Sequence, residues 1–543
     1  MMIILFLLGT ALFVLLPTNF SVIMKEQNDA QARYAADAGI QVASALISDD
    51  IQNGEADEIP GELDSSSGSP LAPWKYQVQI TPGAENGSGS LLSYALESTG
   101  TNGTFSKRIT TVIEQESFGE YLVFTNSEIA PDGSTLWYVP GLTLMDGPVF
   151  TNGQFNVDIP ENYYQDGFCC DSSGNNLPPS PFFLSTATSV SPPSYQYPDG
   201  VNYGGSPPYD SSGNPIPGDY EDIYKGGRSD LITGAKPIPF PTGYLNIQDA
   251  SWGGNSGFPT ASGLYVNQSL IGTSAPTHGR GNPSSQNYPY VTTGIYVQGT
   301  VNQITMGTDP VSENSTTTLS QGASVYKITY VNTNPVTLPA ETIVNEKPIS
   351  GPRTINTNSL IIRNNNQYFI YQGLSNGTIF VNGNIGSSSR GGILGKIKGK
   401  YSVAAIGNLY IDGNLDYQDT QAGQPPTNSN DLLGLIGTNV IIGNSAPSNL
   451  TIYADIYAGK QSDGSLKGWV YAQNFDTRQT GTLQLFGGVV SVYRITTGMI
   501  DLYTGEMLSG YAKTLHYDPR LAQTPPPYFP TTGKFRTIYW HEE

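Results

Sequence analysis

The sequence has few charged residues, and this shortage limits the classes of protein it can encode. Only 13% of its 543 residues are charged, against about 25% in an average globular domain. Disordered chains combine low hydrophobicity with a high charge content, so this composition argues against disorder. The polar residues are mainly Ser, Thr, Asn and Gly among Tyr, Val and Ile, which is typical of β-sheet surfaces. The net charge of −20 disfavours non-specific attraction to nucleic acid or anionic lipid.

Cysteine and histidine are also scarce. Cys169 and Cys170 are adjacent, so they cannot link distant segments, and they form either a strained vicinal disulfide or two thiols. No third cysteine completes a metal site or a C-x-x-C motif. His278, His516 and His541 lie far apart, and the H-E-x-x-H, G-x-S-x-G and phosphate-loop motifs are absent. We therefore expect neither an enzyme nor a bound cofactor.

Isolated carboxylates leave two alternatives open. Parallel β-helix enzymes that act on polysaccharides use clustered aspartates, and Asp412, Asp416 and Asp455 near strand-like runs are the candidates here. Asp171 and Asp210 each begin a similar "DSSGN" segment that resembles the start of a calcium loop. Neither segment has the further carboxylates or the closing Glu of such a loop. Asx turns are therefore the favoured interpretation, and no metal site is predicted.

The only long apolar run is at the N-terminus. Residues 1–22 contain no charged side chain, and a run of this length can span a bilayer. The basic segment that opens a signal peptide is missing, and Pro17 would kink the helix. Residues 25–47 continue as an Ala-rich helix. Small residues dominate one side of it, which suits close helix-to-helix packing; the plainer alternative is a single-pass anchor with a stalk.

The segment "QARYAADAGIQVASALI", after an apolar run with an internal proline, resembles type IV pilin-like proteins. The match is to the large minor pilins, whose helix carries a Tyr-Ala-Ala-Glu-Ala-Gly-Ile type of motif. Its residues here are Tyr34, Ala35, Ala36, Asp37, Ala38, Gly39 and Ile40, with Asp in place of Glu. The resemblance implies that this helix packs in a filament with major and other minor pilins, and lies in the membrane before assembly. No Glu precedes Glu26; if Pro17 is the kinking proline, the mature start and its glutamate lie upstream of Met1.

The rest of the chain reads as β structure. Runs at 74–80, 91–98 and 108–113, separated by Gly-, Asn- and Pro-rich turns, predict an antiparallel meander. From residue 294, short runs such as "GTIFVNGNIG" and "NLYIDGNLDYQ" recur with similar turns, which favours a parallel β-solenoid over a sandwich or propeller. The final strand, "KFRTIYWHEE", would complete the pilin-like sheet. This tail and residues 401–417 look like the pilin-like proteins of the ComZ competence type.

We therefore predict a mainly β fold with one long N-terminal α-helix. The helix and an antiparallel sheet form a pilin-like part into which a large parallel β-solenoid-like region is inserted. The expected divisions are a helix at 1–47, a meander at 48–118, a loop-rich lobe at 119–290, the solenoid-like region at 291–515, and a return loop and strand at 516–543.

One stretch departs from the acidic average. Residues 347–411 contain seven basic residues and no Asp or Glu. On one strand, alternating lysines would share a face, and nearby Tyr and Phe could stack on bases, so the stretch is a candidate DNA-binding surface. The alternative is a solvated hairpin whose cations pair with acids elsewhere in the fold. The seven residues are Lys347, Arg353, Arg363, Arg390, Lys396, Lys398 and Lys400.

These expectations combine into one hypothesis. The chain would be a minor pilin-like subunit, anchored in the inner membrane and then displayed at the tip of a type IV pilus or competence pseudopilus, where it acts in adhesion or DNA capture. The resemblance to the ComZ type implies DNA handling; a host or surface ligand is the other partner. The alternative is a membrane-anchored surface β-helix protein that binds or acts on carbohydrate.

Overall fold

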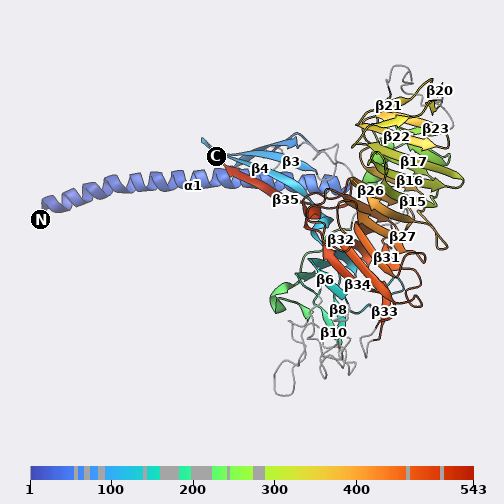
Figure 1. The fold of residues 1–543 in the computed structure, drawn as a ribbon. Coiled ribbons are helices and arrows are strands. Elements are labelled where there is room, and N and C mark those ends of the chain that lie inside the picture. Colours follow the sequence, from blue (N-terminus) through green and yellow to red (C-terminus); the bar gives the residue numbers. More distant parts are fainter. Residues whose placement is uncertain are drawn as a thin grey trace, which may run out of the picture. The chain divides into compact units, whose positions relative to one another are not determined.

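The computed structural model describes two compact units (Figure 1). Unit 1 comprises Met1–Gly87, Leu91–Glu116 and Gly533–Glu543, and unit 2 comprises Ser88–Ser90 and Ser117–Thr532. The described residues are 2–53, 59–65, 74–83, 92–138, 143–158, 183–196, 223–240, 245–272, 288–340, 342–345, 347–459, 465–501 and 507–543.

Unit 1 is a long helix packed on an antiparallel sheet. Helix α1 spans Met2–Asn53 and continues six residues beyond the predicted end at 47. The Ser48–Asn53 segment contains no Gly or Pro, and Ile51 packs against the sheet, so the first helix breaker is Gly54. The helix therefore extends six residues into the segment that was expected to belong to the meander.

The sheet of unit 1 has five strands in the order β1-β2-β3-β4-β35. Buried and less buried residues alternate along β3 and β4, as expected of an antiparallel sheet with one covered face. The last strand lies beside β4, so the end of the chain completes the sheet begun before residue 118. The bounds are β1 Glu62–Asp64, β2 Lys75–Pro82, β3 Ser93–Asn102, β4 Phe105–Ser117 and β35 Thr531–Glu542.

Small residues bring α1 close to this sheet. A Cβ atom on Gly100 of β3 would lie 2.0 Å from the Ala32 carbonyl oxygen and 2.3 Å from the Ala36 nitrogen. A Cβ on Gly39 would in turn meet Ser98 Oγ at 2.4 Å. The backbones of helix and sheet are therefore in close contact, and Ile40 and Ile47, further along the helix, belong to the apolar core between them.

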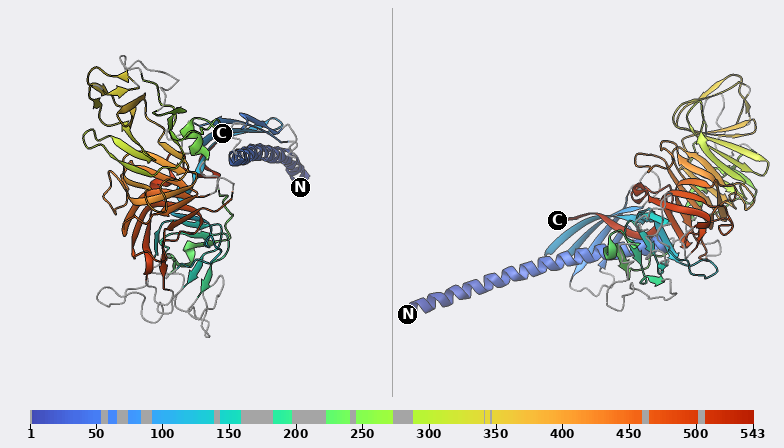
Figure 2. Two further views of the ribbon diagram at one scale, coloured as in Figure 1. Left: turned by 90° about the vertical axis from the view of Figure 1, so that its right-hand side faces the viewer. Right: turned by 60° about the horizontal axis from the view of Figure 1, so that its bottom comes forward.

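Unit 2 is built around a long ladder of parallel strands. Its order is β14-β24-β26-β28-β30-β32-β5-β7-β9-β11, and every neighbouring pair is parallel. Figure 2 shows these strands from two further directions. The bounds are β14 Ile295–Gln298, β24 Thr378–Asn382, β26 Lys400–Ala405, β28 Leu432–Gly437, β30 Asn449–Ala458, β32 Gly481–Tyr493, β5 Val123–Ser127, β7 Val149–Thr151, β9 Ala187–Ser189 and β11 Leu231–Thr233.

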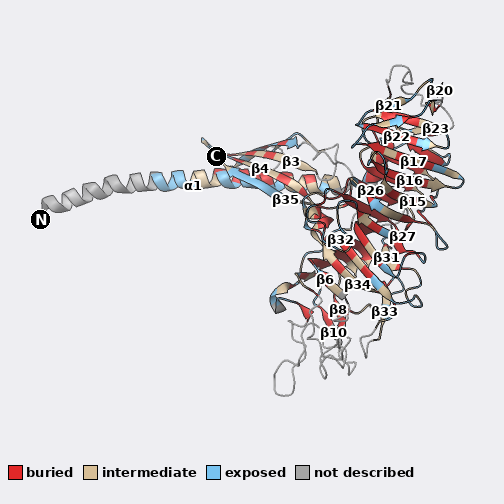
Figure 3. Ribbon diagram, viewed as in Figure 1, coloured by how far each residue is buried: buried red, intermediate tan, exposed pale blue. Residues whose placement is uncertain are grey.

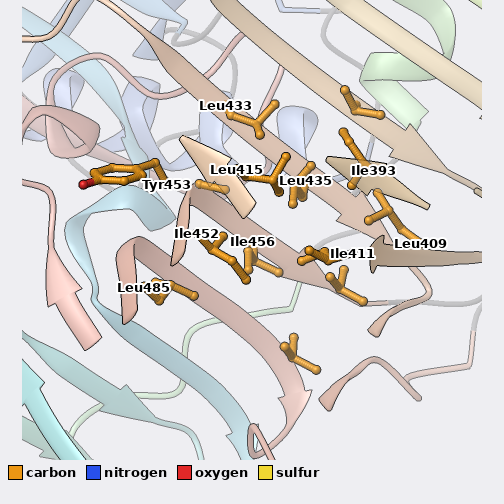
Figure 4. Close-up of a cluster of buried hydrophobic side chains, with 14 of the residues drawn as sticks. Ile393, Leu409, Ile411, Leu415, Leu433, Leu435, Ile452, Tyr453, Ile456 and Leu485 are labelled. Carbon is orange, nitrogen blue, oxygen red and sulfur yellow. The ribbon is translucent and has the colours of Figure 1, made fainter. Parts of the chain in front are cut away.

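The register of this ladder aligns apolar residues of successive strands in rows. One row places a mostly aromatic or aliphatic side chain on each of eight strands, and its members all belong to one buried cluster with residues of helix α4 (Leu245–Trp252). The opposite face is a second apolar core, part of which Figure 4 shows. Both faces are thus covered, which explains strands such as β28 that are buried throughout. The row is Tyr296, Phe380, Ala404, Ile436, Tyr457, Val490, Phe124 and Phe150.

Two more parallel ladders accompany the first, and the second of them shares β30 and β32 with it. One runs β15-β25-β27-β29-β31, and the other joins the N-terminal halves of β30 and β32 to β34 and β6. Figure 3 shows that buried and less buried residues are mixed along several of these strands, such as β15 and β34. The bounds are β15 Gln303–Thr308, β25 Ile393–Ile397, β27 Asn408–Tyr417, β29 Asn439–Ile442, β31 Trp469–Ala472, β34 Met507–Tyr517 and β6 Thr143–Asp146.

An antiparallel extension departs from this pattern. Strands β15, β16, β17, β22 and β23 pair antiparallel in that order. The strands of a β-solenoid stack in parallel, whereas the strands of this extension pair antiparallel. The solenoid as a whole therefore stays a prediction. The bounds are β16 Ser315–Gln321, β17 Ser324–Val331, β22 Ser359–Asn364 and β23 Gln367–Gln372.

Short elements fill the remaining described segments of unit 2. The strands are β8 Asn156–Asp158, β10 Ser194–Gln196, β12 Gly263–Val266, β13 Ser269–Leu270, β18 Val336–Leu338, β19 Ile343–Val344, β20 Lys347–Pro348, β21 Arg353–Ile355 and β33 Gly498–Ile500. The 3₁₀ turns are η3 Phe118–Glu120, η4 Gly227–Asp230 and η5 Pro519–Ala522. Among the described residues, no helix combines the length and apolar character needed to cross a membrane.

Candidate ligand-binding site

The basic residues of the 347–411 stretch are distributed over several elements of unit 2. Lys396, Lys398 and Lys400 do not share one strand: β25 ends at Ile397, and Gly399, with φ +112°, turns the chain into β26. Glycine suits this left-handed backbone because it has no Cβ. The expectation that alternation gives the three lysines one face was therefore wrong.

Each of these lysines has its own surroundings. Lys396 is opposite Asp416 of β27. Lys398 donates from Nζ to the carbonyl oxygen of Glu313 at 2.7 Å. Lys400 is exposed at the start of β26. Acidic residues and carbonyl groups from other segments thus lie beside two of the three.

The arginines are equally dispersed. Arg353, at the start of β21, donates from Nη1 to the Tyr288 hydroxyl at 3.3 Å. Arg390 lines a cavity of about 400 Å³ together with Asp412. Lys347 lies in β20.

Arg363 belongs to a pocket of about 470 Å³ on the antiparallel extension. Its floor is a row of register partners across three strands, Lys327 of β17, Arg363 of β22 and Tyr368 of β23. Arg363 lies over the Tyr368 ring at 5.6 Å from its centroid, and its Nε donates to the Asn365 carbonyl at 2.8 Å. A second pair, Thr329 and Ile361, lies two residues along the same strands.

Two loops line this pocket and contact each other, since Asn334 Nδ2 donates to the Ser312 carbonyl oxygen at 3.0 Å. The first loop precedes β16 and contributes Asp309, Val311 and Ser312. The second follows β17, contributes Asn334 and Pro335, and continues through β18 to Pro339. The second loop is held by buried Asn314, whose Oδ1 accepts from the backbone nitrogens of residues 332, 333 and 334 at 3.1, 2.8 and 3.2 Å. Val311, Pro335 and Val336 line the pocket with apolar side chains that are at least partly exposed.

Asp309 is the carboxylate at this site. Its Oδ1 accepts from the backbone nitrogens of Val311 and Ser312 at 3.2 and 3.0 Å, and its Oδ2 accepts from Lys327 Nζ at 3.2 Å. The Ser312 hydrogen bond and the neighbouring lysine hold the pKa of Asp309 below its usual value. Asp309 is therefore fully engaged in closing its own loop and in pairing with Lys327.

The sequence signal for this pocket was incomplete. Arg363 was a candidate, but Lys327 lies outside the basic stretch and Asp309 was not singled out. Lys327 sits at a polar position of the alternating run "SVYKITYV", which predicts its strand. Only the pairing of β17 with β22 reveals that it lies opposite Arg363.

The three aspartates considered for carbohydrate chemistry occupy different environments. Asp412 lines the cavity that also contains Arg390. Burial raises the pKa of Asp416, and Lys396 opposes this shift. Asp455 is fully buried on β30 between Gly434 and Gly488 of the adjacent strands, and burial and the nearby Asp518 raise its pKa well above the usual value. No group of three or more His, Cys, Asp or Glu side chains arranged to hold a metal ion occurs in the described part of the chain.

A buried charged cluster in unit 2 was missed at the sequence level. Arg494 Nε lies 3.9 Å from Glu128 Oε2, and its guanidinium lies 3.3 Å from the centre of the Tyr138 ring. Desolvation and the adjacent Arg494 lower the pKa of Lys513 to about 7. Desolvation raises the pKa of Glu128, against the effect of Arg494. These residues lie in four separate segments, so no local pattern could have connected them.

The pilin-like motif of α1 is split between two faces of the helix. Ala35, Ala36, Gly39 and Ile40 are buried against the sheet of unit 1, so these small residues serve packing within the chain. Tyr34, at 65% exposure, and Asp37 face away from it. Cys169, Cys170, Asp171, Asp210 and His278 lie outside the described residues.

The fold of unit 1 is thus one long helix packed on a five-stranded antiparallel sheet. No protein-family model matches the chain, and no curated protein matches it. Among solved structures, it is similar to the competence-associated pilin ComZ from Thermus thermophilus, with 13% identity and a TM-score of 0.28, over 95% of this chain and 97% of that one. ComZ is of the type that the C-terminal tail and residues 401–417 resemble.

Proposed function

We propose that this protein is a minor pilin-like subunit displayed at the tip of a type IV pilus or competence pseudopilus, where unit 2 acts in adhesion or DNA capture. The main support for this proposal is that α1 buries only one of its faces within the chain. From Ala32 to Ile47 one face of the helix packs on its own sheet, while Tyr34 and Val42 on the other face stay exposed. Residues 22–27 are exposed as well. A helix that exposes one face and extends beyond its own sheet is suited to packing against the helices of other subunits after release from the inner membrane.

The size of unit 2 supports a terminal position. It is inserted between β4 and β35 of a sheet that would otherwise close directly. A body of this bulk on every subunit would clash along a filament, whereas a single copy at the tip has room.

Filament incorporation is testable by co-purification. The chain, produced with the major pilin of its host, should appear in sheared pili at low stoichiometry, and immunogold labelling should locate it at filament ends. Tyr34→Asp and Val42→Asp together should remove it from pili without changing its stability, because both side chains are exposed. Recovery of the double variant in pili at the parental level would contradict the proposal.

A DNA-binding assay distinguishes the two proposed roles of unit 2, DNA capture and adhesion. DNA capture is motivated by the excess of basic residues at 347–411, which are distributed over several elements of unit 2, and adhesion is supported by the pocket over β17 and β22. DNA capture predicts micromolar affinity for duplex DNA that weakens with salt. The Lys396→Ala, Lys398→Ala, Lys400→Ala triple variant should bind at least about tenfold more weakly, with Lys225→Ala, Lys236→Ala as the matched control. Absence of binding at low salt would leave adhesion as the role.

A further inference from the structure

We propose that the pocket over β17 and β22 binds an acidic sugar, with Arg363 holding the sugar carboxylate. This inference deepens the proposed adhesion role and depends on it only for the biological setting. The binding chemistry itself belongs to the isolated chain.

The pocket contains more positive than negative charge, which favours binding of an anion. Lys327 and Arg363 are directly opposite each other on paired strands, an arrangement of like charges that destabilises a sheet. Asp309 compensates one of them, since it pairs with Lys327 and otherwise closes its own loop. Within the described part of the chain, the two terminal nitrogens of Arg363 have no hydrogen-bond acceptor. A carboxylate bound there would relieve the repulsion.

Arginine at this position also specifies the kind of anion. Its planar guanidinium can present two parallel N–H groups to one carboxylate. Tyr368 lies beneath it at 5.6 Å, and the hydrogen bond from its Nε to Asn365 fixes one edge. Only the outer edge is left to face a ligand, so the site favours a single bidentate carboxylate.

The remainder of the pocket matches a sugar ring better than an extended peptide. Both floor strands are already paired on each side, β17 with β16 and β22, and β22 with β17 and β23. Their backbone groups therefore cannot add a peptide strand. Side chains must provide the contacts. Val311, Val336 and Pro339 line the pocket and are at least partly exposed, so they offer an apolar surface for the C–H face of a ring. Thr329 offers a hydroxyl group, and Asn334, whose Nδ2 donates to the Ser312 carbonyl oxygen, offers its amide oxygen.

The pocket is held in shape without a ligand. Asp309 fixes the first loop through two backbone nitrogens, and Asn314 fixes the second through three. A site that is already ordered loses less conformational entropy on binding. A pocket of about 470 Å³ is in the range that holds small ligands, so the recognised unit is one or two sugar residues of a longer glycan.

The test is calorimetric titration of the full-length chain in detergent. The probes are D-glucuronate and D-galacturonate, with D-glucose and D-galactose as neutral counterparts and hexaglutamate as an acidic peptide. At least one uronate should bind, at least tenfold more tightly than its neutral counterpart. Arg363→Gln should weaken this binding at least tenfold. Arg390→Gln, an arginine of the same basic stretch in another cavity, should leave it unchanged.

Three results would overturn the proposal. They are no uronate binding at 20 mM (a concentration of about that order exceeds typical weak sugar affinities), equal affinity for the neutral sugars, or equal effects of the two arginine variants. Hexaglutamate binding that depends on Arg363 without uronate binding would assign the pocket to acidic peptides. Thermal unfolding of Arg363→Gln should match the parent, which separates lost binding from lost folding. Loss of the chain from pili would contradict only the proposed filament role, because the titration does not require a filament.

Discussion

Gly100 lacks a side chain where the helix backbone occupies the available space. In Gly100→Ala the new methyl group would lie 2.0 Å from the Ala32 carbonyl oxygen, and backbone must move to admit it. Overpacking of this kind costs about 1–3 kcal/mol, so the variant should lower the stability of unit 1 by that amount in chemical denaturation. Gly61→Ala is the control, because open space surrounds Gly61. Equal stability of the two variants would show that helix and sheet are not in close contact.

Asp455 makes a pH-dependent contribution to the stability of unit 2. Its pKa is raised in the folded chain, so the folded state holds its proton more tightly than the unfolded state does. The contribution is present below the unfolded pKa of about 4 and is lost as pH rises through the folded pKa. Above the folded pKa, the unfolded chain is favoured because it exposes the aspartate charge to water.

Asp455→Asn should therefore stabilise unit 2 at pH 8 and have much less effect at pH 4. Differential scanning calorimetry at the two pH values measures the difference. Asp412→Asn, on the wall of an open cavity, should show no such gain at pH 8. An Asp455→Asn variant that is destabilised equally at both pH values would mean that the carboxyl group is needed for packing whatever its charge.

At the scale of single elements, aromatic rings mark the register of the parallel ladder. Tyr453, Phe486 and His516 are register partners on β30, β32 and β34, with ring centroids 4.7 Å apart at both steps and the planes stacked. Phe486 is the shared ring. Its removal loses two stacked contacts and leaves a cavity.

Phe486→Ala should cost about 3–5 kcal/mol of unit 2 stability, as for other buried Phe-to-Ala changes. Equilibrium unfolding followed by tyrosine fluorescence is a suitable measurement. Leu508→Ala on β34 removes an exposed side chain and should change stability by less than about 0.5 kcal/mol. A comparable loss in both variants would be incompatible with the stacked register.

The sequence predicted the elements more successfully than their partners. Alternation and turn residues located β2, β3 and β4, and the Ala-rich run located α1. The sequence also identified the residues of the pilin-like motif. Whether Ala36 and Gly39 face the sheet or another subunit, however, depends on the placement of Val78 and Ser98, which are distant in sequence. The same is true of Lys327 opposite Arg363. Pairings of this kind are set by long-range strand register, which local periodicity does not encode.

At the scale of the whole molecule, the helix is part of the core of unit 1. Ala36, Ile40, Ala43 and Ile47 pack in one cluster with Val78, Ile80 and Leu96. A chain beginning at Ser48 would lack all four helix residues and expose the sheet. A chain beginning at Lys25 would keep them.

The chain that begins at Lys25 should therefore retain a folded unit 1, and the chain that begins at Ser48 should not. Hydrogen exchange should find β2 and β3 protected in the chain that begins at Lys25 and unprotected in the one that begins at Ser48, while β30 and β32 are protected in both. Equal protection of β2 and β3 would mean that the sheet is stable without its helix.

Unit 2 leaves and rejoins unit 1 through neighbouring strands of one sheet. Arg108 of β4 and Glu543, next to the end of β35, exchange backbone hydrogen bonds of 3.4 and 2.9 Å, so the strands are antiparallel and the end of β4 lies beside the start of β35. Tension on unit 2 would pull both strands from the same end and in the same direction. Because bonds between antiparallel strands run perpendicular to them, tension directed along β4 and β35 would load the bonds between β4 and β3 in shear, so that many bonds would have to break together.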